Sequence, residues 1–142
     1  MNKIILTDTC FWLGLVDPND QFHDVSLAIA ELLEGNKILF PWPCLYETIS
    51  TRLTRRREQL LYLEAIISKS NIILFSDNDY KEEALKQVFQ FNQIAGCTYS
   101  LTDSVIREIL KDVNIKVDYL VTYNVPDFQD ICNQRLIDII ND

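Results

Sequence analysis

The sequence predicts an α/β fold with a central, mostly parallel sheet. Short, continuous apolar runs of strand length recur along the 142 residues, and such runs are typical of strands that are covered on both faces. Segments with an apolar residue at every third or fourth position separate the runs and predict amphipathic helices. Strands that alternate with helices favour a parallel sheet with helices packed against it.

Four apolar runs predict strands: residues 3–7 (KIILT), 38–40 (ILF), 71–75 (NIILF) and 117–122 (VDYLVT). The final segment, RLIDII at 135–140, is short enough to be a strand or a helix end, and we interpret it as a fifth strand. With only three glycines and four prolines, the sequence contains no linker-like stretch. We therefore expect residues 1–142 to form one domain.

Helical patterns lie between these runs. They comprise residues 25–33, closed by Gly35; 45–53, opened near Pro43; 60–67; 84–89; and 105–113. Four aromatic residues with apolar neighbours are expected to pack in the core rather than to stack on bases: Phe11, Trp12, Phe40 and Trp42.

The composition restricts the possible partners and compartment. There are 13 basic and 21 acidic residues, and the net charge of -8 argues against non-specific binding to a polyanion. Four widely spaced cysteines (Cys10, Cys44, Cys97, Cys132) form no metal-binding pattern and are expected to be reduced and buried. The N-terminus resembles neither a signal peptide nor a membrane span, so we expect a soluble cytoplasmic protein.

Acidic residues follow several of the predicted strands. Asp8 comes directly after the first strand, and Glu47 lies in the helix that follows the second. Asp103 begins the helix before the fourth strand, and Asn124 and Asp127 come after that strand. Because strand ends and the starts of the following helices share one edge of a parallel sheet, we expect these side chains to converge there.

Such a cluster of carboxylates predicts a metal site. Two carboxylates about 4 Å apart repel by roughly 4 kcal/mol at an effective dielectric near 20, and a bound cation would relieve that repulsion. Oxygen ligands without Cys or His favour Mg2+ or Mn2+. A divalent ion held by carboxylates can activate a water for phosphodiester hydrolysis.

Four segments in this order resemble those of PIN-domain ribonucleases, particularly the VapC-like toxins of bacterial toxin-antitoxin pairs. They are IILTDT, LYETIS, SLTDSVI and LVTYNVPDF, and they span essentially the whole chain. The resemblance implies a three-layer α/β/α nuclease that cleaves RNA. It also implies that Asp8, Glu47 and Asp103 bind metal, with Thr9 as a polar neighbour. A toxin of this family would be silenced by a small antitoxin and would often form a homodimer.

The sequence departs from the family pattern at its fourth acidic position. Many members have Asp where this chain has Asn124, followed by an Asp-Phe pair that matches Asp127 and Phe128. An amide oxygen carries no charge. Either Asp127 supplies the fourth carboxylate and Asn124 only supports the site, or one metal site is weaker.

Each acidic residue also has a structural interpretation. Asp8 and Asp103 suit helix N-termini, and Glu47 would be favoured by the helix dipole. Asp127 suits a Pro-Asp turn. The arginines of TRLTRRRE (Arg52, Arg55, Arg56 and Arg57) lie beyond Glu47 on the same predicted helix and could contact RNA phosphates, contact an acidic partner or form a solvated face.

Two other functions fit parts of the pattern. The first is a catalytically inert PIN-like module that binds protein or RNA, in which Asn124 reflects a lost metal. The second is a receiver-like signalling domain, which requires paired acids after the first strand and a lysine after the last. The segments KIILTDT and LVTYNV provide neither, so the sequence favours the nuclease.

Overall fold

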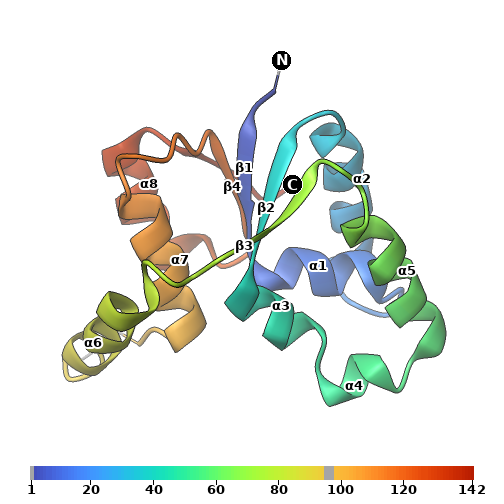
Figure 1. Ribbon diagram of the computed structural model, residues 1–142, viewed down its shortest axis with the longest axis horizontal. Helices are drawn as coiled ribbons and strands as arrows, with labels where there is room; N and C mark the ends of the chain where they lie inside the picture. The colour runs from blue at the N-terminus through green and yellow to red at the C-terminus, as the bar shows by residue number, and fades with distance from the viewer. Residues whose placement is uncertain (1, 95–97) are drawn as a thin grey trace.

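The protein is built around a five-stranded sheet with helices on both faces (Figure 1). A computed structural model describes residues 2–94 and 98–142. The strands are β1 (Ile4–Thr7), β2 (Lys37–Pro41), β3 (Ile72–Phe75), β4 (Tyr119–Val121) and β5 (Asp138–Ile140). They lie in the order β3-β2-β1-β4-β5, and each pairs in parallel with its neighbours. The predicted parallel sheet and all five predicted strands are confirmed.

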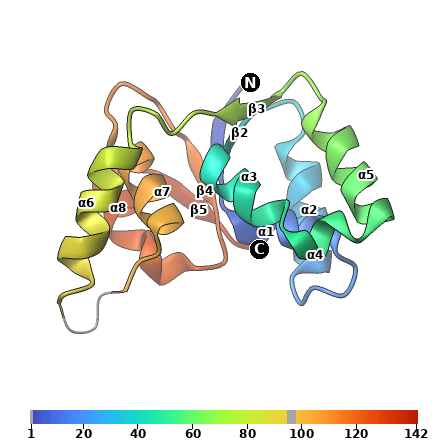
Figure 2. The same ribbon diagram turned by 60° about the horizontal axis from the view of Figure 1, so that its bottom comes forward.

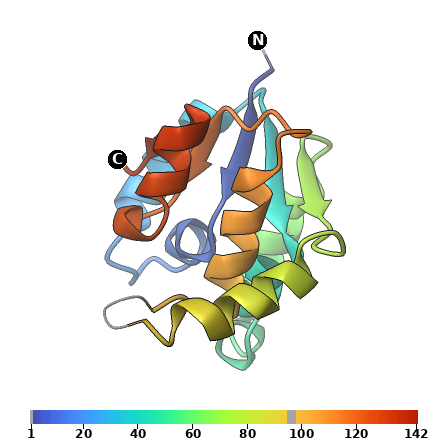
Figure 3. The same ribbon diagram turned by 90° about the vertical axis from the view of Figure 1, so that its left-hand side faces the viewer.

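Two groups of helices enclose the sheet. Figure 2 shows α1 (Thr9–Val16), α2 (His23–Leu33) and α5 (Arg57–Ile67) on one side, with α7 (Leu101–Lys111) and α8 (Gln129–Arg135) on the other. The helix α6 (Lys81–Phe91) lies across the outside of α7, as Figure 3 shows. The three-layer α/β/α arrangement is confirmed.

The structure corrects the predicted helices in two ways. The expected helix over 45–53 is broken: α3 (Trp42–Thr48) ends at the cap residue Ile49, and α4 (Thr51–Thr54) follows as a separate turn. The arginine segment is therefore not on the helix of Glu47. Helices α1 and α8 were not predicted, and the Pro-Asp turn suggested for Asp127 is the 3-10 turn η1 (Val125–Asp127).

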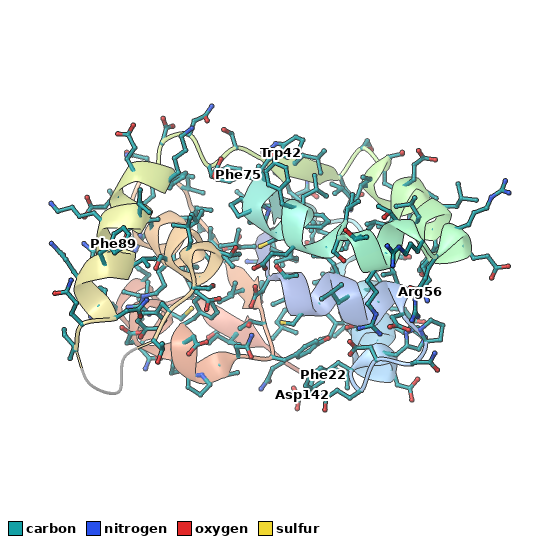
Figure 4. The ribbon with its side chains drawn as sticks, turned by 90° about the horizontal axis from the view of Figure 1, so that it is seen from below. Phe22, Trp42, Arg56, Phe75, Phe89 and Asp142 are labelled. Atoms are coloured by element: carbon teal, nitrogen blue, oxygen red, sulfur yellow. The ribbon has the colours of Figure 1, made fainter. Side chains whose placement is uncertain are left out.

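Aromatic side chains anchor the first helix to the sheet. Trp12 stacks on Phe40 with ring centroids 4.2 Å apart, and its indole N–H donates to the Thr7 hydroxyl at 2.8 Å. Phe11, Trp12 and Phe40 are buried as predicted. The expectation for Trp42 is wrong: it lies on the first turn of α3, 38% exposed (Figure 4).

The described cysteines are free thiols. Cys44 and Cys132 are buried, as expected, whereas Cys10 is only partly buried. Cys97 lies outside the described residues. Among the helices of the described ranges, none combines the length and apolarity needed to cross a membrane.

Helices α1 and α2 approach each other closely at Gly14. A Cβ atom at this position would lie 2.5 Å from the Ser26 hydroxyl oxygen and 3.2 Å from the Phe22 carbonyl oxygen. The Ser26 hydroxyl in turn donates to the Phe11 carbonyl and is hydrogen-bonded to the hydroxyl of Tyr123, beyond β4. Gly14 thus allows a contact that ties the helix beginning after Asp8 to the end of β4.

We predict that Gly14→Ala destabilises the protein by about 1–3 kcal/mol because of this overlap. In an unobstructed helix the same change would stabilise by about 1 kcal/mol. Chemical denaturation measures the effect, and Ser26→Ala tests its source, since the double variant should lose less stability than the sum of the single ones. A Gly14→Ala variant as stable as the wild type would contradict the close packing.

Candidate functional site

The carboxyl ends of β1 and β4 form the centre of the candidate site. β1 is the middle strand of the sheet, and the chain leaves it to build β2 and β3 on one side and β4 and β5 on the other. Such a switch in strand order leaves a crevice beyond the strand ends, where α/β proteins usually bind ligands. Asp8 lies at this point, between the end of β1 and the start of α1.

Asp8 is a buried carboxylate with both oxygens hydrogen-bonded. Its Oδ1 accepts from the backbone N–H of Thr9 at 2.8 Å, as the N-cap of α1, and its Oδ2 accepts from the Thr122 hydroxyl at 2.8 Å. Only 3% of the residue is exposed. Burial raises the pKa of Asp8 to about 6, although the hydrogen bonds from Thr122 and Thr9 oppose the shift, and the charge of Asp103 adds to it.

Cys10 lies beside this carboxylate. Its thiol is 3.6 Å from the Asp8 Oδ2, and its sulfur accepts the backbone N–H of Tyr123 at 3.3 Å. Burial, and then the Asp8 charge, raise the pKa of the Cys10 thiol to about 12. The thiol is therefore protonated at neutral pH and is unsuited to act as a nucleophile.

Thr9 connects Asp8 to Glu47. While its backbone N–H binds Asp8, its hydroxyl donates to the Glu47 Oε1 at 2.6 Å. Glu47 lies on α3 with its side chain exposed, so it can reorient without disturbing the core. The structure thus places Thr9 between two of the predicted acids.

Asp103 lies in the first turn of α7, as predicted, but it is not the N-cap residue. It is the third residue of α7 and forms a capping box with Ser100, which is the N-cap residue itself. Its charge also contributes to raising the pKa of both Asp8 and Asp127. The charge of Asp103 therefore acts on both carboxyl groups while its side chain caps α7.

The loop after β4 distinguishes Asn124 from Asp127. Asn124 is exposed, and its backbone N–H donates to the Thr122 hydroxyl at 3.0 Å. Asp127 ends the turn η1, which contains Pro126, so the predicted Pro-Asp turn is present. Burial, followed by the charge of Asp103, raises the pKa of Asp127, and Arg107 lowers it. Asp127, and not Asn124, therefore carries a charge that interacts with Asp103.

Three polar residues near the site were not predicted, namely Thr122, Arg107 and its partner Asp130. Thr122 closes the apolar run VDYLVT and gave no separate signal in the sequence. Arg107 follows Asp103 by four residues, a spacing that places both on one face of α7. Its guanidinium donates to the backbone carbonyl of Asp127 at 2.7 Å and to both carboxylate oxygens of Asp130 at 2.8 Å.

The predicted arginines lie away from these acids. Arg52 and Arg56 both pair with Asp17, at the end of α1, with nitrogen–oxygen distances of 3.5 and 3.8 Å. Figure 4 shows Arg56 on that side of the molecule. Arg55 is exposed.

The donor types at the site fit a hard cation, although their arrangement is not a ligand shell. Within residues 2–94 and 98–142, no three histidine, cysteine or carboxylate side chains converge closely enough to hold a metal ion. The oxygens of Asp8 and Glu47 instead face the hydrogen-bond donors described above. Burial is the main cause of the raised pKa of Asp8 and Asp127, and the charge of Asp103 adds to both shifts. A divalent cation would relieve that added repulsion.

Comparison with known proteins identifies the fold. No protein-family model and no curated protein matches the sequence. The chain is similar to the crystal structure of VapC20, a sarcin-ricin loop cleaving toxin of Mycobacterium tuberculosis, with a TM-score of 0.70, 17% identity and coverage of 89% of this chain and 94% of that one.

Two further solved structures are similar. One is VapBC2 of Rickettsia felis bound to a DNA fragment from their promoter (TM-score 0.63, 17% identity, 97% of this chain and 98% of that one). The other is FitAcB of Neisseria gonorrhoeae (TM-score 0.55, 13% identity, 96% of each chain). The chain has the fold of the PIN-domain proteins of toxin-antitoxin systems, and the resemblance drawn from the sequence is confirmed at that level.

We predict that Asp8→Asn stabilises the metal-free protein at high pH. Folding raises the pKa of Asp8 from 3.8 to about 6, so the wild type loses stability as the pH rises through 6, by about 3 kcal/mol in all. Asn keeps the N-cap but carries no charge. Chemical denaturation in the presence of a chelator should therefore show that the free energy of unfolding of the variant increases relative to that of the wild type between pH 4 and pH 8. A difference that stays constant over this range would contradict this account.

Proposed function

We propose that this chain is a Mg2+- or Mn2+-dependent endoribonuclease of the PIN type and acts as the toxin of a toxin-antitoxin pair. The observation that carries the proposal is the buried Asp8 at the strand edge, coupled to Asp103 by charge and to Glu47 through Thr9. The similarity to an RNA-cleaving toxin supports the same substrate class. We further propose that residues 1–142 form a single cytoplasmic nuclease domain.

In this proposal, Asp8, Glu47 and Asp103 hold the ion, and Asp127 supplies the fourth carboxylate. The ion, when bound, supplies a water of lowered pKa and stabilises negative charge on the phosphodiester. Thr122 and the Thr9 backbone orient the Asp8 carboxylate, and the exposed Glu47 rotates from Thr9 towards the other acids. Asn124 supports the loop through Thr122 and carries no charge into the site.

We predict that the purified protein cleaves structured RNA only with Mg2+ or Mn2+ present. Because Asp8→Asn and Asp103→Asn each remove a charge that the ion requires, each should lower the cleavage rate at least ~100-fold. Asp24→Asn, on the exposed start of α2, is the matched control and should cleave normally.

The same preparation separates the nuclease from an inert binding module. If calorimetry detects no Mn2+ binding and RNA is bound but left intact, the module is the better description and the nuclease proposal fails. Micromolar Mn2+ binding that Asp103→Asn abolishes supports the nuclease.

We propose that a small antitoxin docks through an amphipathic helix in the groove between α2 and α5. The groove has a volume of about 330 Å³ and an apolar lining that includes Trp12 and Ile66. Leu27 and Tyr62 at its sides are 39% and 45% exposed, and Glu31 and Glu34 supply negative charge. These features suit an apolar helix face flanked by basic residues. The similarity to the VapBC2 and FitAcB structures supports a partner of this kind.

A short open reading frame next to the gene would supply the candidate partner. We predict that Leu27→Glu weakens copurification of that partner at least ~10-fold, because it buries a charge against an apolar helix. Val113→Glu changes an exposed apolar residue beyond α7 and is the matched control. Retention of the partner by the Leu27→Glu variant would rule out this groove. We also propose a homodimer. The exposed Arg52 and Arg55 and the partly buried Arg56 are proposed contacts to RNA or to a partner.

A further inference from the structure

Arg107 is an unusual residue for its position. Among the described residues, Asp8 and Arg107 are the charged residues that are buried, at 3% and 5% exposure. A buried guanidinium is unfavourable unless its donors are satisfied by a paired charge and hydrogen bonds. Both buried charges form hydrogen bonds with the segment that follows β4, Asp8 with Thr122 and Arg107 with the carbonyl of Asp127.

The guanidinium is held on three sides. Nη1 and Nη2 each donate at 2.8 Å to a different carboxylate oxygen of Asp130, so the pair is bidentate. Nη1 also donates to the backbone carbonyl of Asp127 at 2.7 Å. The Tyr99 ring lies against the cation, 4.7 Å from its centroid to the guanidinium carbon.

These contacts join α7 to the turn that carries Asp127. Arg107 lies one helical turn after Asp103, so the residue that binds the Asp127 backbone and the acid whose charge acts on Asp127 project from the same face of α7. The carboxylate of Asp130 occupies the fork of the guanidinium. Arg107 is thereby kept from pairing directly with the acids of the site.

The burial and bonding exclude a second interpretation, in which Arg107 grips an RNA phosphate. A phosphate contact requires donors that reach solvent, whereas the Arg107 side chain is only 6% exposed and its fork is already filled by Asp130. Arg107 therefore affects the site indirectly, through its hydrogen bond to the backbone carbonyl of Asp127.

We propose that Arg107 is a positioning residue that locks the Asp127 turn against Asp103, with Asp130 orienting its guanidinium. This inference rests on the proposed function, because it assigns Arg107 the task of setting the spacing between two carboxylates that share an ion. Removing a residue that orients a metal ligand without touching the metal typically lowers metal affinity by about 10–100-fold.

The test is calorimetric titration with Mn2+ at a temperature where every variant is folded, as verified by circular dichroism. We expect Arg107→Gln to raise the Kd at least ~10-fold. Arg107→Lys keeps the charge but not the bidentate fork, and it should restore part of the affinity. Asp130→Asn changes an exposed residue and provides a second route, with a smaller rise in Kd, should the Gln variant not fold.

The chain supplies a matched control in Arg135. Its Nη1 donates to the Leu110 carbonyl at 3.0 Å, so it forms the same kind of bridge between α8 and α7, but at the opposite end of α7 from Asp103. Arg135→Gln should lower the melting temperature and leave the Kd within ~2-fold of the wild type. If Arg107 had a purely structural role, Arg107→Gln and Arg135→Gln would have similar Kd values for Mn2+.

The outcomes separate this inference from the proposed function. If the wild type binds Mn2+ and Arg107→Gln binds it equally well, or if Arg135→Gln loses as much affinity, the positioning role is overturned and the nuclease proposal stands. If the wild type itself binds no Mn2+, the proposed function fails and this inference fails with it.

Discussion

The structure depends on one unfavourable placement, a carboxylate buried between the central strand and the first helix. Asp8 caps α1, accepts the Thr122 hydroxyl from the end of β4 and donates its backbone N–H to the carbonyl of Val121. The hydrogen bonds that the carboxylate accepts from Thr122 and Thr9 stabilise its charged form, yet burial still dominates and raises the pKa of the carboxyl group. A residue kept ionisable in such a place is a common sign of function, because a neutral cap would be more stable.

The topology places the segments that carry the other acids around the carboxyl end of β1. β1 occupies the middle of the sheet, so the segments after β2 and β4 flank its carboxyl end although they lie dozens of residues away in the chain. Glu47 comes from the β2 side, and Asp103 and Asp127 come from the β4 side. Of the two buried charges, Asp8 caps α1 and Arg107 lies on α7, and these helices cover opposite faces of the sheet (Figure 2).

The elements that produce a repeating pattern of apolar residues were predicted from the sequence. The features that depend on single side-chain contacts were missed. Continuous apolar runs identified the five strands, since both faces of this sheet are covered. Helix α1 was missed because TCFWLGLV is apolar on nearly every side, which removes the helical period. The break at Ile49 and the short α8 give no periodic signal. The candidate acids were selected by their place after strands, whereas Thr122, Arg107 and Asp130 acquire their partners only in three dimensions.

Diffraction from crystals soaked in Mn2+ tests the central claim most directly. The account predicts an anomalous peak at the carboxyl edge of β1, with oxygens of Asp8, Glu47 and Asp103 about 2.1–2.3 Å away and Glu47 turned from Thr9. A soaked crystal with no peak at this edge, or with the ion bound elsewhere while the Thr9–Glu47 hydrogen bond persists, would contradict it.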